Sequence, residues 1–225
     1  MIANSEKQTL LKLLQIKQKM TKDSEPNNNQ SKNKRYIKFK RLFDVSLILL
    51  SLPLTLCLLL FGFILVLFGS RGPIFFIQPR VGKDNKSFNL IKLRTMVHHD
   101  LPHVDHTIEN DERIYPLGKW LRLTKIDEIP QLLNVLRGEM AIIGPRPERV
   151  EIVTKISKLH HLYNSRHKIL PGITGWAQVH NPKATPNENL DKLKYDIDYI
   201  ANMNLKLDAV ILLKTIKIIL LRNSL

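Results

Sequence analysis

Residues 119–148 read KWLRLTKIDEIPQLLNVLRGEMAIIGPRPE. The stretch predicts a helix over residues 127–136, because Asp127 is a favoured N-cap residue, Pro130 fits the first turn and a glycine follows the end. The adjacent acids Asp127 and Glu128 would then stand where the free backbone donors of a helix start attract anions. This acid pair is the strongest chemical signal in the chain.

The acid pair has two interpretations. In the structural one, Asp127 caps the helix and Glu128 complements its dipole, which is the commoner role of an isolated pair. In the chemical one, Arg122 and Lys125 lie within about a turn, and a carboxylate kept ionised there can hold a divalent cation or attack phosphorus. Arg146, fixed between two prolines, either binds phosphate through two parallel hydrogen bonds or forms a surface turn.

An apolar segment runs from Val45 to Phe68 without a charged side chain. As a helix it would be roughly 36 Å long, enough to cross a bilayer core of about 30 Å. It is not a signal peptide, because a long polar stretch precedes it and no small-residue cleavage site follows. A membrane helix is therefore favoured over the buried helix of a soluble domain.

Pro53 and the flanking charges bear on how this segment meets the membrane. A proline inside a helix removes a hydrogen bond and kinks the rod. Basic residues near membrane segments favour the cytoplasmic side. They occur on both flanks: Lys34, Arg35, Lys38, Lys40 and Arg41 before the segment, and Arg71, Arg80, Lys83, Lys86, Lys92 and Arg94 after it. A helix that dips in and returns satisfies both flanks, so we favour a re-entrant helix over a span.

The composition indicates an anionic partner. Lys and Arg number 35 against 20 Asp and Glu, which gives a net charge of +15. Such a balance suits anionic lipid, a phosphorylated substrate or nucleic acid. The basic stretches largely lack the interleaved aromatic residues that single-stranded nucleic-acid binding uses, so we expect no nucleic-acid partner. The single cysteine, Cys57, excludes an intramolecular disulfide.

The first 33 residues form a separate polar arm. Residues 10–16 could make an amphipathic helix, with a disordered tail as the equal alternative, and residues 26–31 are typical of a linker. A second polar stretch, residues 98–113, is rich in histidine and predicts a loop. His99 and His103 have a zinc-like spacing, but no helix signal surrounds them, so we expect no metal site there.

The remaining pattern predicts short strands and several helices. Residues 74–77 and 88–93 flank a Gly-Lys-Asp-Asn turn, which indicates a hairpin. Helices are expected over residues 115–123, 149–167, 190–202 and 205–221, and a turn at 171–175 leads to a strand at 176–179. The last helix mixes lysines with apolar residues and suits either a membrane interface or ordinary core packing.

Several motifs in the same order give a family resemblance. They are KRLFD at 40–44, QPRVG at 78–82, KLRTM at 92–96, DERI at 111–114, DEIPQ at 127–131, GPRPE at 144–148 and PGITGWAQV at 171–179. Over about 80% of its length the chain resembles the bacterial sugar transferases, the monotopic phosphoglycosyl transferases that start glycan assembly on a polyprenol carrier. It departs after Val179, where that family often has Asn-Gly-Arg and this chain has His180-Asn181-Pro182-Lys183.

The resemblance implies roles for individual residues. Asp127 is the implied nucleophile and Mg²⁺ ligand, and Glu128 either orients the metal or accepts a proton from the acceptor. The implied phosphate-binding residues are Lys92, Arg94, Arg122 and Arg146. The helix break is expected near a Ser-Pro pair, although here Leu52 separates Ser51 from Pro53.

The resemblance also implies the overall organisation. We expect an α+β fold with a re-entrant membrane helix and a mostly helical cytoplasmic catalytic domain, which carries a small hairpin and interfacial amphipathic helices. Residues 1–33 are the arm, 34–70 the anchor and 71–225 the catalytic domain. The expected donor is a nucleotide diphosphosugar with UDP as the expected nucleotide. The expected acceptor is polyprenyl phosphate, and the expected location is the cytoplasmic face of the bacterial inner membrane. The rival class is a non-catalytic adaptor that binds anionic lipid and a partner enzyme.

Overall fold

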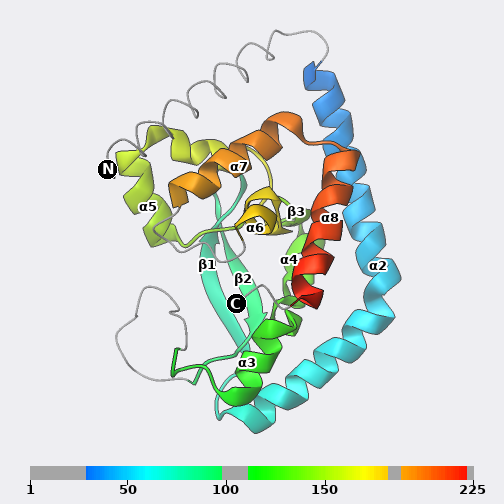
Figure 1. The fold of residues 1–225 in the computed structure, drawn as a ribbon, viewed down its shortest axis with the longest axis vertical. Coiled ribbons are helices and arrows are strands. Elements are labelled where there is room, and N and C mark those ends of the chain that lie inside the picture. The colour runs from blue at the N-terminus through cyan, green and yellow to red at the C-terminus, as the bar shows by residue number, and fades with distance from the viewer. Residues whose placement is uncertain (1–28, 98–110, 182–188, 222–225) are drawn as a thin grey trace.

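The computed structural model describes residues 29–97, 111–181 and 189–221, which form a mixed and mostly helical structure (Figure 1). The α-helices are α2 (Asn29–Gly69), α3 (Pro116–Leu123), α4 (Gln131–Arg137), α5 (Val150–Leu159), α6 (Trp176–His180), α7 (Asn189–Asn202) and α8 (Leu205–Leu220). The strands are β1 (Phe75–Val81), β2 (Ser87–Leu93), β3 (Ala141–Ile143) and β4 (Gly172–Thr174). Short 3₁₀ turns are η1 (Lys83–Asn85), η2 (Ile126–Glu128) and η3 (His161–Lys168).

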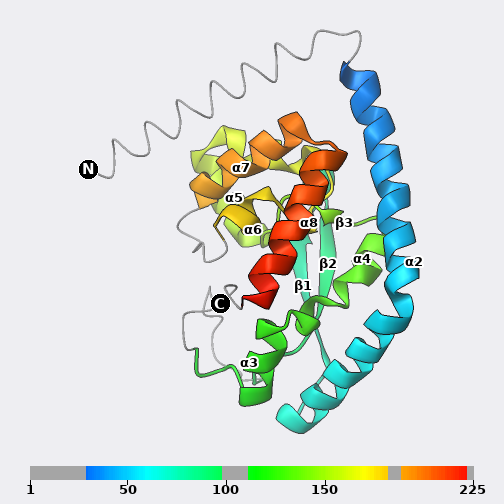
Figure 2. The ribbon, with the colours of Figure 1, turned by 45° about the vertical axis from the view of Figure 1, so that its right-hand side comes forward.

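Helix α2 contains the whole apolar segment and bends along its length (Figures 1 and 2). Pro53 lies inside it, and the Ser51 hydroxyl donates back to the Ile48 carbonyl at 3.2 Å, a contact that often bends helices. Since α2 already begins at Asn29, the predicted linker is wrong for residues 29–31. The rest of the linker and the predicted arm lie outside the described residues.

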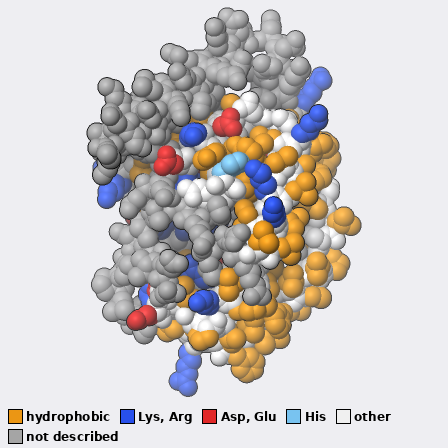
Figure 3. Space-filling view, viewed as in Figure 1, with side chains coloured by type: hydrophobic (Ala, Val, Ile, Leu, Met, Phe, Trp, Pro, Cys, Tyr) orange, Lys and Arg blue, Asp and Glu red, His pale blue; other side chains and the backbone are white. Residues whose placement is uncertain are grey.

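The surface of α2 remains largely apolar. Its stretch Arg35–Gly69 is long and apolar enough to cross a membrane, and only 11% of its most apolar window is buried. Figure 3 shows hydrophobic side chains gathered along this side of the molecule, over α2 and α8. The helix could therefore be a membrane helix, as the sequence predicted, while its re-entrant course stays a prediction.

Polar side chains attach the first half of α2 to the rest of the fold. Asp208 of α8 accepts hydrogen bonds from Tyr36 at 2.6 Å and Lys40 at 2.7 Å. The Asp44 carboxylate accepts the Ile142 amide of β3 at 3.3 Å. Arg41 donates to the last carbonyls of α4, including that of Leu136 at 2.9 Å. The Lys-Arg-Leu-Phe-Asp motif thus holds α2 against three elements, α4, α8 and β3.

The predicted hairpin is confirmed. Strands β1 and β2 pair antiparallel from Phe75 opposite Leu93 to Val81 opposite Ser87. Asp84 and Asn85 take positive φ angles of 54° and 59° in the turn, a conformation that Asp and Asn adopt more readily than most residues. The Lys92 side chain is thereby presented near one end of this ribbon.

A second, parallel pairing joins segments far apart in the sequence. Strand β3 pairs with β4 through Ala141 opposite Gly172 and Ile143 opposite Thr174. The strand predicted over residues 176–179 is wrong, because the chain leaves β4 at Gly175 and forms helix α6. The Gly-Pro-Arg-Pro segment follows β3 directly, so the pairing of β3 with β4 fixes where the backbone of Arg146 lies.

The other predicted helices are largely confirmed. Those over 115–123, 190–202 and 205–221 match α3, α7 and α8 closely. The helix predicted over 149–167 is α5 followed by η3, because the α-helical bonding ends at Leu159. Helix α8 buries Ile211 in the core, as the core-packing alternative expects, and exposes apolar side chains such as Leu213 and Leu220. Its place at a membrane interface stays a prediction.

Candidate active site

Asp127 and Glu128 lie in η2, between α3 and α4. Their predicted place at the start of an α-helix is wrong: Lys125 turns the chain with a φ of 58°, and α4 begins only at Gln131, with Pro130 as its N-cap residue. Asp127 is the N-cap residue of neither element, since those positions belong to Lys125 in η2 and Pro130 in α4. Both acids are nevertheless buried, with 6% and 8% of their surface exposed. The capping interpretation therefore loses its support.

Two cations from distant segments converge on Glu128. Lys92 of β2 and Arg146 of the loop after β3 each place a nitrogen 2.9 Å from the same oxygen, Oε1 of Glu128. The Arg146 side chain is 42% exposed, so its outer edge faces solvent. The structure thus brings together four residues that the sequence singled out, Lys92, Asp127, Glu128 and Arg146.

The two acids differ in their electrostatics. Burial raises the pKa of Asp127 to about 6, against the attraction of the nearby Lys92 ammonium and with the help of the Glu128 charge. Burial also acts to raise the pKa of Glu128, but Arg146 and Lys92 outweigh it and hold that pKa well below its ordinary value. Glu128 is a firmly ionised anchor for cations, whereas Asp127 carries a charge that the protein compensates less well.

Asp127 also has an unused oxygen. Its Oδ1 is buried and has no hydrogen-bond partner among the residues that the structure describes. A buried carboxylate oxygen in that state is costly, and such groups are typical of functional sites. The oxygen is available to a metal ion or to an electrophile.

A magnesium ion fits this arrangement. Mg²⁺ usually keeps several waters and takes one or two carboxylates together with substrate phosphates. Asp127 Oδ1, buried and without a partner among the described residues, could supply one such ligand. Across residues 29–97, 111–181 and 189–221 no group of three or more His, Cys, Asp or Glu could hold a metal, so an all-protein cage is not what these segments offer. The histidine-rich stretch lies outside the described residues, and its predicted lack of a metal site stays a prediction.

The two other predicted phosphate-binding arginines lie differently. Arg122, in the last turn of α3, is half-buried and, like Lys125, acts to lower the pKa of Asp127. Arg94 is buried, and its guanidinium donates to the carbonyls of Ser70 and Arg71 in the turn after α2, at 2.5 and 2.6 Å. Arg94 thus binds the turn that follows the anchor helix, and its predicted phosphate contact stays a prediction.

The loop that carries Arg146 is held by residues that the sequence did not single out as functional. The buried Arg166 of η3 donates to the Arg146 carbonyl at 2.9 Å, and it pairs with the buried Asp196 of α7 at 2.8 Å. Arg80 of β1 donates to the Pro147 carbonyl at 3.3 Å. Local sequence patterns could not reveal these contacts, because the partners come from separate elements.

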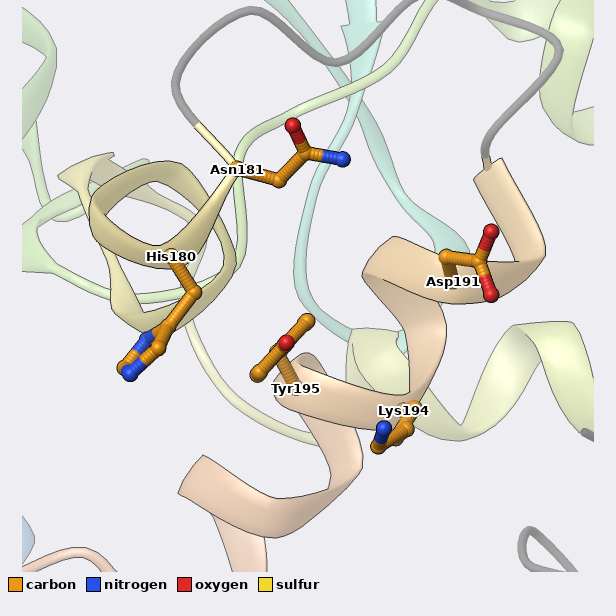
Figure 4. Close-up of a pocket in the computed structure, with 5 residues that line it drawn as sticks. All are labelled: His180, Asn181, Asp191, Lys194 and Tyr195. Carbon is orange, nitrogen blue, oxygen red and sulfur yellow. The ribbon is translucent and has the colours of Figure 1, made fainter.

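A shallow pocket of about 240 Å³ lies where the sequence departs from the resemblance. Figure 4 shows its lining residues between the end of α6 and the first turns of α7: His180, Asn181, Asp191, Lys194 and Tyr195. The His180 and Tyr195 rings stack with centroids 4.9 Å apart. The acid pair is not among the lining residues, so this pocket is a different feature from the convergence of charges around Glu128.

Comparison with known proteins gives several relatives that are named undecaprenyl-phosphate sugar phosphotransferases. An Aeromonas hydrophila protein named UDP-N-acetylgalactosamine-undecaprenyl-phosphate N-acetylgalactosaminephosphotransferase is 39% identical over 187 residues, or 82% of this chain and 44% of the relative. The undecaprenyl-phosphate glucose phosphotransferase of Komagataeibacter xylinus is 38% identical over 79% of this chain and 35% of the relative.

A shorter relative is covered more fully. The UDP-glucose:undecaprenyl-phosphate glucose-1-phosphate transferase of Caulobacter vibrioides is 37% identical over 189 residues, or 82% of this chain and 71% of the relative. The chain spans less than half of the first two relatives' length. The sequence model of the family described as "bacterial sugar transferase" matches residues 35–222. With this match over most of its length, the chain belongs to the bacterial sugar transferase family.

Proposed function

We propose that the protein transfers a sugar-1-phosphate from a UDP-sugar to undecaprenyl phosphate, the first membrane step of glycan assembly. One observation supports this most directly. A buried carboxylate oxygen of Asp127 has no hydrogen-bond partner in the described part of the chain, and the next residue is a glutamate on which two cations converge. The names of the relatives, which describe undecaprenyl-phosphate sugar phosphotransferases, support the same reaction class.

The reaction proceeds in two displacements at phosphorus. An oxygen of Asp127 attacks the sugar-proximal phosphorus of the donor; the bond to the distal phosphate breaks, and UMP leaves. An oxygen of undecaprenyl phosphate then attacks the aspartyl-linked phosphorus, which releases Asp127 and forms the polyprenyl diphosphosugar. The covalent step replaces one displacement between two anions by two easier ones.

Lys92 and Arg146 bind the donor phosphates. Both reach one Glu128 oxygen in this structure, so their charges already converge on a point that a phosphate oxygen can share. Arg122 adds positive potential on the side of Asp127. Developing charge on the transferred phosphoryl group is stabilised by these fixed cations, which need little rearrangement during the reaction.

Glu128 orients cations rather than moving a proton. Its pKa is held well below the ordinary value by Arg146 and Lys92 against the effect of burial, so it is a weak base. Asp127, whose pKa burial raises to about 6, is the better nucleophile of the two. Bound Mg²⁺ would supply charge neutralisation on the phosphate oxygens, with Asp127 Oδ1 as its protein ligand.

The membrane setting follows from α2. We propose that this helix enters the cytoplasmic leaflet, breaks near Pro53 and returns, with residues 71–225 as the catalytic domain on the cytoplasmic face of the inner membrane. The apolar surface of α2 and the basic flanks on both sides support this course. It brings a lipid acceptor and a soluble donor to one interface.

An assay of nucleoside monophosphate release tests the proposal. Purified protein is incubated with undecaprenyl phosphate, Mg²⁺ and a panel of UDP-sugars. We expect release of UMP with at least one donor, and formation of a lipid product of matching sugar and phosphate content. A folded, membrane-bound protein that releases no UMP from any donor would favour the adaptor alternative.

A further inference from the structure

The loop that carries Arg146 is held through four consecutive backbone carbonyls. Each carbonyl from residue 145 to residue 148 accepts a hydrogen bond from outside the loop, and the donors belong to β4, η3 and β1. The donors are the Gly172 amide to Pro145 at 2.9 Å, Arg166 to Arg146 at 2.9 Å, Arg80 to Pro147 at 3.3 Å and the Val81 amide to Glu148 at 2.9 Å. The loop is therefore fixed by contacts that do not involve the Arg146 side chain.

Arg166 is the most deeply buried side chain among these donors. Its side chain is 2% exposed, and that of its ion-pair partner Asp196 is 1% exposed. The same guanidinium donates to the Tyr163 hydroxyl at 2.6 Å through Nη1 and to the Arg146 carbonyl through Nη2. Its contact with Asp196, at 2.8 Å, is an ion pair rather than an aligned hydrogen bond.

A buried ion pair is an inefficient way to stabilise a fold. Removing two charges from water costs nearly as much as their attraction returns, and apolar pairs of similar volume are often as stable. Such a pair offers instead a rigid donor at a fixed position. Here the donor is the Arg166 guanidinium, which donates to the backbone carbonyl of Arg146. The guanidinium of Arg146 in turn contacts Glu128 at 2.9 Å.

We propose that Arg166, held by Asp196, is a positioning residue that sets the Arg146 guanidinium at the donor phosphates. The proposal rests on the proposed function in assigning Arg146 that role. Arg166 itself touches no reacting group: it fixes the backbone of Arg146 through the carbonyl. The ion pair with Glu128 holds the guanidinium at the other end of the Arg146 side chain. Small misplacements of a charged group can cost about 100-fold in rate.

The test removes both charges of the pair together. The variant Arg166→Met/Asp196→Leu leaves no unpaired buried charge, so the fold and thermal unfolding should stay close to wild type. We expect kcat/KM for the UDP-sugar to fall by about 10- to 100-fold. Arg166→Lys, which keeps the buried charge but not the planar fork, serves as the second variant should the double change fail to fold, and we expect a loss in the same direction.

A double-mutant cycle separates positioning from general damage. In an Arg146→Ala background, the same pair of changes should reduce kcat/KM by no more than about twofold, because the group it positions is gone. The matched control is Lys40→Gln, which breaks the ion pair with Asp208 at the α2–α8 contact. Its effect should be the same in both backgrounds. Equal losses from the Arg166 variant in both backgrounds would overturn the proposal, and so would an unimpaired Arg146→Ala enzyme.

Hydrogen exchange gives a readout that does not need turnover. The peptide containing residues 144–150 should exchange faster in the Arg166 variant, while the β1–β2 hairpin should not change. Unchanged exchange in the loop would overturn the proposal even if activity fell. If wild-type protein released no UMP from any donor, the proposed function would fail, and the exchange result alone would decide whether Arg166 fixes the loop.

Discussion

Lys92 and Arg146 each lie 2.9 Å from the same oxygen of Glu128, although they come from segments more than 50 residues apart in the sequence. The pairing explains how one buried carboxyl stays ionised while its neighbour Asp127 is pushed toward protonation. In the proposed mechanism Lys92 therefore has two separable effects, one on the donor phosphates and one on the pKa of Asp127.

Lys92→Met should therefore change the pH profile as well as the rate. Among nearby charges Lys92 does most to lower the pKa of Asp127, against the effect of burial, so its removal raises that pKa. We expect kcat/KM to fall by roughly 10- to 1000-fold and the acidic limb of its pH profile to move to higher pH. Lys86→Met, at an exposed position in the same hairpin, is the control and should change neither kcat/KM nor the pH profile. If the rate fell but the acidic limb of the pH profile did not move, the predicted effect of Lys92 on the pKa of Asp127 would be wrong.

Asp127→Asn should stabilise the folded protein in a pH-dependent way. Burial raises the folded pKa of Asp127 to about 6 from an ordinary value of 3.8, so ionisation costs the folded state free energy. Wild type should lose stability relative to the variant as pH rises from about 4 to about 6, and the difference should level off at a value on the order of 3 kcal/mol. Chemical unfolding in detergent across pH 3.5–8 measures this. Equal stability at all pH values would mean that Asp127 is not electrostatically strained.

Arg146→Lys should damage the enzyme although it keeps the charge. An ammonium cannot reproduce the planar, two-pronged contact of a guanidinium with phosphate. We expect a loss of about 10- to 1000-fold in kcat/KM for the donor, with thermal unfolding unchanged. Arg149→Lys, three residues along, is a matched control for a basic change in the same region. Near-normal turnover of Arg146→Lys would contradict phosphate binding by Arg146 and would support the alternative that it is a surface turn residue.

The re-entrant course of α2 predicts that its two ends share one side of the membrane. Single cysteines replacing Lys38 and Lys86, both at exposed positions, are introduced into a Cys57→Ser background. Both should be shielded from an impermeant thiol reagent in intact cells and both should react after permeabilisation. Opposite accessibility in intact cells would establish a span. Pro53→Leu should favour that span, since it restores the missing hydrogen bond.

The sequence could predict what depends on local pattern. The apolar run, the hairpin with its Asp-Asn turn and the helices α3, α7 and α8 were all predictable, because periodicity and turn residues determine them. Asp127 and Glu128 were identified for a partly wrong reason. The α-helix expected to start at Asp127 begins at Gln131, since the left-handed Lys125 and the 3₁₀ turn come first.

What escaped prediction depends on contacts between distant segments. The pairing of β3 with β4 turns residues 172–174 into a strand and leaves 176–180 to a helix, which no local propensity determines. The donation from the Arg94 guanidinium to the turn after α2 was not predicted either, because it joins β2 to a distant segment; the phosphate contact of Arg94 stays a prediction. Arg166 and Asp196 belong to different elements, and a buried ion pair leaves no signature in either.

The central claim is that Asp127 forms a covalent bond to the transferred phosphoryl group. The measurement is rapid-quench mass spectrometry of the protein incubated with UDP-sugar and Mg²⁺ in the absence of acceptor. Wild type should release UMP and gain the mass of a sugar phosphate on the peptide that contains Asp127, whereas Asp127→Asn should fold, bind membrane and show neither. If wild type shows no adduct and releases UMP only when undecaprenyl phosphate is present, the attack is direct, and Asp127 is not the nucleophile.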